Sequence, residues 1–220
     1  MKHEKHYKKM FSLLVVCLGL FLLSGCSSEY EAGREKQETN ITTESDVSEN
    51  VTPADASCTA VIEVADYGTI TVELDKDAAP ETVSNFVSLA KDGFYNGLTF
   101  HRIIDGFMIQ GGDPEGNGTG GSDQTIIGEF SENGFENKLT HTRGVISMAR
   151  SDDYNSASSQ FFIVHEDSTF LDGSYAAFGY VTDGMDIVDA ICKDAKPIDS
   201  NGSIPPEEQP IIESIRIVEN

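Results

Sequence analysis

Basic side chains are scarce in this 220-residue chain. It has 15 lysines and arginines against 37 aspartates and glutamates, which gives a formal net charge of −22 at pH 7. Such a chain repels phosphate backbones and anionic lipid headgroups, which argues against nucleic-acid binding and against electrostatic binding to acidic membranes. We interpret the acidity as a source of solubility in a salty exterior, in preference to attraction of basic client proteins.

Histidine is also rare, and the histidine spacing predicts no metal site. Of the five histidines, His3 and His6 lie at the extreme amino terminus, and His101, His141 and His165 are scattered. None of the spacings is typical of metal ligands. No Ser-His-Asp or Cys-His arrangement indicates covalent catalysis. We therefore expect neither a metal nor another cofactor.

No apolar run is long enough to span a bilayer comfortably. The longest, Phe11–Leu23, follows four lysines and leads into Leu-Ser-Gly-Cys, which ends at Cys26. This pattern resembles the lipobox of bacterial lipoproteins. It implies a signal peptide over residues 1–25, cleavage before Cys26 and lipidation of that cysteine, where several acyl chains would anchor firmly. The expected location is the extracytoplasmic side of a cell membrane; an ordinary secretory signal is the alternative.

Residues 26–57 are expected to form a disordered acidic tether behind the lipidated cysteine. The segment is rich in Ser, Thr, Glu and Asn and has almost no large apolar residues. It cannot bury a core, and it would hold the following domain off the membrane. Residues 58–220 are long enough for one folded domain, which we expect to be monomeric.

Cys58 and Cys192 are the two cysteines of that domain. Outside the cytoplasm two such residues can pair, and the long loop they would close suggests about 4–5 kcal/mol of stabilisation by chain-entropy estimates. The sequence leaves open whether they form a disulfide or remain as two solvent-facing thiols.

Alternating apolar patterns predict an antiparallel, mainly β domain. Strands are expected at 59–64, 69–74, 98–104, 107–110, 144–150, 160–165, 176–181 and 211–218, and helices at 80–92 and 184–192. Many antiparallel strands with two helices favour a closed or nearly closed barrel.

The stretch 100–112, FHRIIDGFMIQGG, combines a lone cation with large apolar side chains. A turn at Asp105–Gly106 would join two strands. Strict alternation then places Phe100, Arg102 and Ile104 on one face of the first strand, with Met108 and Gln110 together on the second. A guanidinium beside apolar groups is costly to desolvate unless it meets an acceptor.

Several blocks of this sequence resemble the cyclophilin family of peptidyl-prolyl isomerases. They are 100–112, GTGG at 118–121, ISMAR at 146–150, SQFFI at 159–163, FLDG at 170–173 and FG at 178–179, in family order and at family-like spacing. The resemblance implies an eight-stranded antiparallel barrel capped by two α-helices, with the active groove on its outer surface. The implied substrates are proline-containing unfolded or exported polypeptides.

The resemblance also implies a role for each matching residue. Arg102 would be the catalytic donor to the prolyl nitrogen. The substrate-binding set would comprise Phe107, Met108, Phe162 and Leu171 around the proline, Gln110 on the peptide backbone, Ala149, Arg150 and Ser151 along the peptide main chain, Gln160 and Gly118 in the neighbouring subsite, and Phe170 and Tyr175 at the rim.

Some positions depart from the common family pattern. The chain has no tryptophan, and Phe170 stands where many members carry one. Tyr175 stands where many carry histidine, and Arg150 where asparagine is common; the segment 152–158 is one residue longer than the animal pattern. The missing indole argues against tight binding of cyclosporin.

Two other functions remain to be weighed. A non-catalytic module could hold proline-containing segments without turning them over, although it would not need Arg102. Residues 116–121 also fit G-x-G-x-x-G, but a dinucleotide site needs a preceding strand and a following helix. No helical period follows residue 121, so the glycines favour a close-approach loop.

Overall fold

The structure, a computed structural model, describes residues 58–219. The predicted signal peptide, the lipidated Cys26 and the tether therefore lie outside the described residues. Within residues 58–219, no helix combines the length and apolarity needed to cross a membrane.

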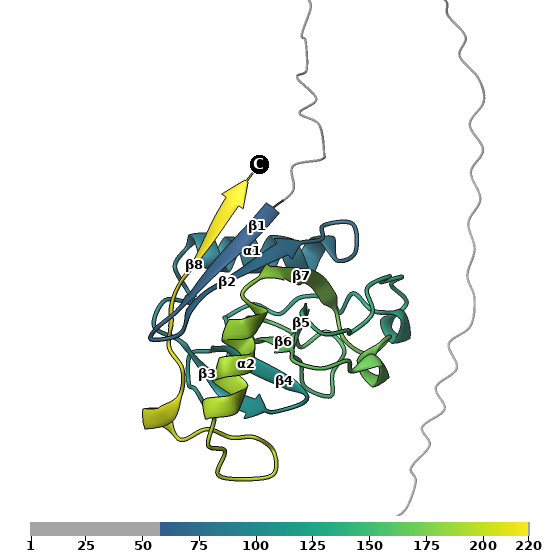
Figure 1. Ribbon diagram of the computed structural model, residues 1–220. Coiled ribbons are helices and arrows are strands. Elements are labelled where there is room, and N and C mark those ends of the chain that lie inside the picture. Colours follow the sequence, from purple (N-terminus) through teal and green to yellow (C-terminus); the bar gives the residue numbers. More distant parts are fainter. Residues whose placement is uncertain (1–57, 220) are drawn as a thin grey trace, which may run out of the picture. The chain divides into compact units, whose positions relative to one another are not determined.

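Eight strands form one antiparallel sheet in the order β3-β4-β6-β5-β7-β2-β1-β8 (Figure 1). They are β1 (Cys58–Val64), β2 (Gly68–Leu74), β3 (Thr99–Ile104), β4 (Met108–Asp113), β5 (Val145–Met148), β6 (Phe161–Val164), β7 (Ala177–Asp183) and β8 (Ile212–Glu219). The sheet curls so far that its edge strands, β3 and β8, come together at their starts. There Thr99 bridges to Ile211, and the Ile212 N–H donates to the Leu98 carbonyl. The predicted barrel is confirmed, with strand ends displaced by at most three residues.

Two helices cover the barrel, as predicted. α1 (Pro80–Lys91) has its proline in the first turn, where the missing N–H costs nothing, and packs on β7 and β8. α2 (Met185–Asp194) packs on β2 and β4. Phe86 of α1 enters the core, with ring centroids 5.2–5.5 Å from Tyr95, Phe161 and Phe178. Three short 3₁₀ turns, η1 (Ser131–Asn133), η2 (Thr169–Leu171) and η3 (Pro206–Glu208), were not foreseen.

A β-bulge in β3 corrects the predicted alternation. Phe100 pairs with Gly111 and Arg102 with Gln110, so two steps along β3 match one step along β4. The extra residue turns Phe100 inward with Ile103, while Arg102 faces outward. The expectation that Phe100 and Arg102 share a face is therefore wrong.

The two cysteines of the domain are free thiols, as in the second alternative, but they are buried and do not face solvent. Cys58 in β1 and Cys192 in α2 are both buried free thiols, so there is no disulfide and no solvent-facing pair. The charged groups around Cys58 belong to Lys76, Glu219 and Lys91, whereas those around Cys192 belong to Asp105, Asp189 and Arg143. The two thiols lie in different parts of the barrel, which explains why they do not pair. Burial raises the pKa of both, that of Cys192 to about 12.

Two histidines, His101 and His141, are buried in the fold. His141 faces the Asp172 carboxylate at 2.8 Å and the Ser147 hydroxyl at 3.0 Å, and both ring nitrogens of His101 lack a partner among the described residues. Burial lowers the pKa of both imidazoles, although Asp172 and Asp113 oppose the shift.

We expect the free energy of unfolding to fall as the pH drops below about 6.5. Below this pH the histidines of the unfolded chain bind protons, whereas the buried histidines of the folded chain, whose pKa values are lower, stay neutral. The stability that they contribute is fully present above the unfolded pKa and is lost as the pH falls toward the folded pKa values. The loss is up to about 1.4 kcal/mol per pH unit for each histidine. Urea unfolding at pH 7.5 and 5.5 measures the loss. Ring-proton NMR titrations assign it, and a free energy of unfolding unchanged between these pH values would contradict it.

Candidate active site

All thirteen residues predicted for the groove line two adjoining hollows on the outer face of the barrel. The larger, about 330 Å³, is lined by Arg102, Phe107, Met108, Gln110, Ala149, Arg150, Phe162, Phe170, Leu171 and Tyr175. The smaller, about 210 Å³, includes Gly118, Ser151 and Gln160 and shares Gln110, Ala149 and Arg150 with the first. An extended peptide could therefore occupy both hollows by passing over the shared residues.

The walls of the larger hollow form a second apolar cluster, separate from the barrel core. Met108, Phe162 and Leu171 are buried in it. Phe107 packs against the ring of Phe170 at 5.6 Å, and Phe170 remains 73% exposed at the rim. Tyr175 meets Phe162 edge to face at 5.9 Å. The hollow is thus a preformed apolar seat beside polar groups.

Arg102 points toward this hollow and is held by neutral acceptors. Its Nε donates to the Asn201 carbonyl at 2.7 Å and its Nη1 to Gln110 Oε1 at 3.0 Å. The guanidinium carbon lies 5.9 Å from the Phe107 ring centroid. Burial lowers the pKa of Arg102, but from a value so high that the group stays charged. No carboxylate of residues 58–219 forms an ion pair with it.

A chain of amide side chains fixes Gln110. While its oxygen accepts from Arg102, its nitrogen donates to Gln160 Oε1 at 2.9 Å, and Gln160 in turn donates to the Gly120 carbonyl at 2.7 Å. Gln110 and Arg102 therefore present one fixed arrangement of donors to the hollows.

The glycine-rich loop wraps a buried carboxylate and holds no helix. Burial alone would raise the pKa of Asp113, but N–H groups of Glu115, Asn117 and Gly118 donate to it and hold the pKa below its ordinary value. The next helical segment is the three-residue η1. A dinucleotide fingerprint would need a helix directly after the loop, so the structure does not support that alternative.

Arg150 is surrounded by three aromatic rings, of which only Tyr175 belongs to the set predicted for the groove. Its guanidinium carbon lies 4.8–5.1 Å from the ring centroids of Phe130, Tyr154 and Tyr175. Nε donates to the Ser174 carbonyl at 2.9 Å. The cation is thereby fixed at the boundary between the two hollows.

Sequence reasoning missed Phe130, Tyr154 and Asn201 as supports of the two arginines. All three lie outside the predicted strands and helices, and no spacing signal links them to Arg102 or Arg150.

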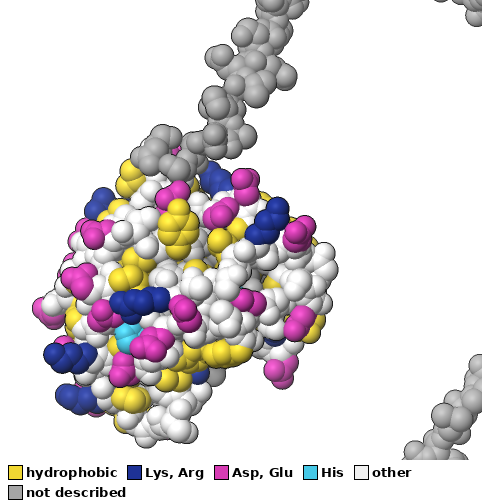
Figure 2. All heavy atoms as spheres, turned by 45° about the vertical axis from the view of Figure 1, so that its right-hand side comes forward, with side chains coloured by type: hydrophobic (Ala, Val, Ile, Leu, Met, Phe, Trp, Pro, Cys, Tyr) yellow, Lys and Arg dark blue, Asp and Glu magenta, His cyan; other side chains and the backbone are white. Residues whose placement is uncertain are grey.

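Acidic side chains are spread over the visible surface, with basic ones more sparse (Figure 2).

Comparison with known proteins agrees with this geometry. Residues 59–217 match the family model described as cyclophilin type peptidyl-prolyl cis-trans isomerase. The chain is 49% identical over 121 residues to peptidyl-prolyl cis-trans isomerase B of Bacillus subtilis, covering 55% of this chain and 81% of that protein. It is 41% identical over 161 residues to isomerase B of Escherichia coli, covering 70% and 96%.

A solved structure supports the same assignment. The cyclophilin type peptidyl-prolyl cis-trans isomerase of Cryptosporidium parvum, crystallised in the presence of the dipeptide Ala-Pro, superposes with a TM-score of 0.64 at 31% identity. The match covers 74% of this chain and 99% of that one. With the family model, the relatives and the fold in agreement, the chain belongs to the cyclophilin-type peptidyl-prolyl cis-trans isomerases.

Proposed function

We propose that this isomerase accelerates X-Pro isomerisation during the folding of exported proteins, with Arg102 assisting the rotation without covalent chemistry. Amide resonance sets a barrier of about 18–20 kcal/mol, and exchange takes tens of seconds or more without a catalyst. As the bond twists, the prolyl nitrogen becomes pyramidal and regains its lone pair. A donor that meets this nitrogen only in the twisted state lowers the barrier.

The observation that carries this proposal is the position of the Arg102 guanidinium beside an apolar seat. Two of its nitrogens are bound to Asn201 and Gln110, and Nη2 makes no hydrogen bond to any residue of 58–219. That nitrogen can donate to the substrate. No proton transfer or nucleophile is needed.

The other groove residues would bind the chain on both sides of the reacting bond. Phe107, Met108, Phe162 and Leu171 would hold the pyrrolidine ring. The main chain at Ala149 and Ser151 would pair with the peptide, Gln110 would bind its backbone, Gln160 and Gly118 would line the next subsite, and Phe170 and Tyr175 would close the rim. The Ala-Pro dipeptide used with the Cryptosporidium relative supports proline-containing peptides as substrates.

We expect Arg102→Ala to lower kcat/KM about 100- to 1,000-fold, the loss typical when a preorganised donor is removed. NMR exchange of an Ala-Pro peptide measures the rate, and thermal melting checks the fold. Arg216→Ala, an exposed arginine of β8, is the matched control and should retain full activity. If Arg102→Ala still binds the peptide and isomerises it at the wild-type rate, Arg102 is not the donor. If the wild type binds without accelerating exchange, the protein is a binding module.

Arg150 would favour an acidic residue before the proline. Arg150 lines both hollows, so a chain that occupied them would pass it, and the Ser174 and Ser151 carbonyls that accept from its guanidinium carry no net charge. A partly exposed charge pair is worth about 0.2–1 kcal/mol, which corresponds to a roughly two- to fivefold preference.

The measurement is kcat/KM for Glu-Pro against Lys-Pro peptides. The wild type should favour Glu-Pro, high salt should reduce the preference, and Arg150→Asn should remove it. Arg216→Asn should leave it unchanged. Equal turnover of both peptides by the wild type and by Arg150→Asn would refute this role.

We also propose that a lipid on Cys26 holds the enzyme at the extracytoplasmic membrane face. In a bacterial host, the full chain should fractionate with membranes, and Cys26→Ser should lose the lipid mass and leave the membrane fraction. Cys17→Ser is the control. It changes a cysteine inside the apolar run and should leave both the lipid mass and the membrane fractionation unchanged. Retention of Cys26→Ser on membranes, or an unmodified Cys26 in the wild type, would count against the anchor.

A further inference from the structure

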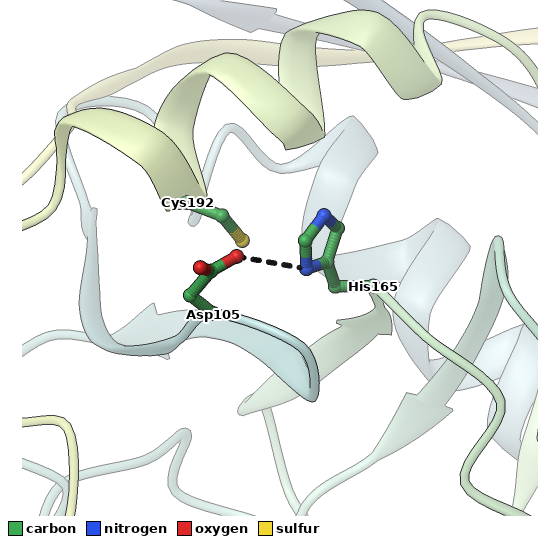
Figure 3. Close-up of side chains that lie close together, drawn as sticks. All are labelled: Asp105, His165 and Cys192. Carbon is green, nitrogen blue, oxygen red and sulfur yellow. Dashed lines mark ion pairs between the residues drawn. The ribbon is translucent and has the colours of Figure 1, made fainter.

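A cluster of potential metal ligands lies outside the groove. Asp105 follows β3, His165 follows β6 and Cys192 comes from α2, and their side chains converge (Figure 3). One ligand atom from each lies within 4.8 Å of the others, and Asp105 Oδ1 is 3.5 Å from His165 Nδ1. The sequence predicted no metal site because these residues are separated by 60 and 27 positions, which no local spacing rule detects.

Two hydrogen bonds determine which nitrogen of His165 can bind a cation. The Gly106 N–H donates to Nδ1 at 2.9 Å, so Nδ1 carries a lone pair. Nε2 faces Asp189 Oδ1 at 3.1 Å and therefore carries the proton. The lone pair thus lies on the nitrogen next to Asp105. A histidine whose far nitrogen donates to a carboxylate is the usual arrangement around protein-bound metals.

We propose that Asp105, His165 and Cys192 bind one zinc-class divalent cation. Thiolate, imidazole and carboxylate together suit zinc, with bonds of about 2.0–2.3 Å. A tetrahedral centre with such bonds separates its ligand atoms by about 3.3–3.6 Å. The distance between Asp105 Oδ1 and His165 Nδ1, 3.5 Å, already fits, and the Cys192 sulfur lies within 4.8 Å of both atoms. On binding, the thiol proton passes to solvent and the Gly106 N–H gives up its bond to Nδ1.

The surroundings favour a cation and allow it to enter. Asp105 and Cys192 line a hollow of about 140 Å³, and the Asp105 side chain is 77% exposed, which leaves a fourth position for water. Arg143 is a positive charge near Cys192 that would repel a cation, but it is paired with Asp189 at 2.7 Å. Asp189 would orient His165 without binding the metal. The alternative is that Cys192 only fills space in the apolar core beneath α2.

The site adjoins the proline seat without sharing residues with it. The backbone N–H of His165 donates to the Phe107 carbonyl at 2.8 Å, and Gly106 precedes Phe107 in the turn. A bound cation would tie this turn to α2. Binding itself does not depend on isomerase activity, so the two can be tested separately.

The test uses the full chain with Cys17→Ser and Cys26→Ser, so that thiols outside the domain do not bind metal. Zinc titration by calorimetry should give one site per chain, and cobalt(II) should give a thiolate charge-transfer band with visible tetrahedral bands. Cys192→Ser should abolish the cobalt–thiolate band, and His165→Gln should weaken binding at least 100-fold. Asp189→Asn should weaken it about 10- to 100-fold, as expected for an orienting partner.

Cys58→Ser is the matched control, a buried cysteine of the same domain, and should change nothing. Circular dichroism melting in EDTA checks that each variant folds. If Cys192→Ser does not fold, Asp105→Asn at an exposed turn takes its place and should weaken zinc binding. No stoichiometric zinc binding, a cobalt–thiolate band that survives Cys192→Ser, or one lost in Cys58→Ser overturns the proposal.

Discussion

The groove depends on a cation held by neutral groups beside apolar walls. An acid next to Arg102 would fix it more strongly, but it would also cancel the charge that faces the hollow. The Asn201 carbonyl and the Gln110 amide oxygen hold the guanidinium at 2.7 and 3.0 Å and leave its charge in place. Gln110 is itself held by Gln160, so the orientation does not rest on a single flexible side chain.

The barrel supplies the rigidity that this arrangement needs. Arg102, Gln110 and Phe162 stand on three adjacent strands, because β3 pairs with β4 and β4 with β6. The bulge in β3 turns Phe100 inward, while Arg102 faces outward. β4 approaches the residues before β6 so closely that a Cβ on Gly112, which has φ +83°, would lie 2.6 Å from the Ser159 carbonyl oxygen. A site on paired strands keeps its geometry better than one on loops.

Local signals in the sequence, namely alternation, proline and glycine positions, predicted the strands and both helices. The resemblance of linear motifs to cyclophilins supplied the residues that line the two hollows. The sequence failed where geometry depends on contacts between distant segments. Alternation could not reveal the bulge that moves Phe100 inward. The cysteine count could not show that Cys58 and Cys192 lie apart. Nothing local connects Phe130 and Tyr154 with Arg150, or Asp105 with His165 and Cys192.

The strong negative charge of the chain makes the two groove arginines more significant. Neither Arg102 nor Arg150 forms an ion pair with an acid of residues 58–219; both are held by carbonyl or amide oxygens and aromatic rings. At physiological salt, charges interact weakly beyond about 8 Å, so acidic groups elsewhere on the surface act little inside the groove. The positive charge of the groove therefore comes from Arg102 and Arg150. Under the proposed function, a peptide bound there would be selected by the residues beside its proline and not by the net charge of the client.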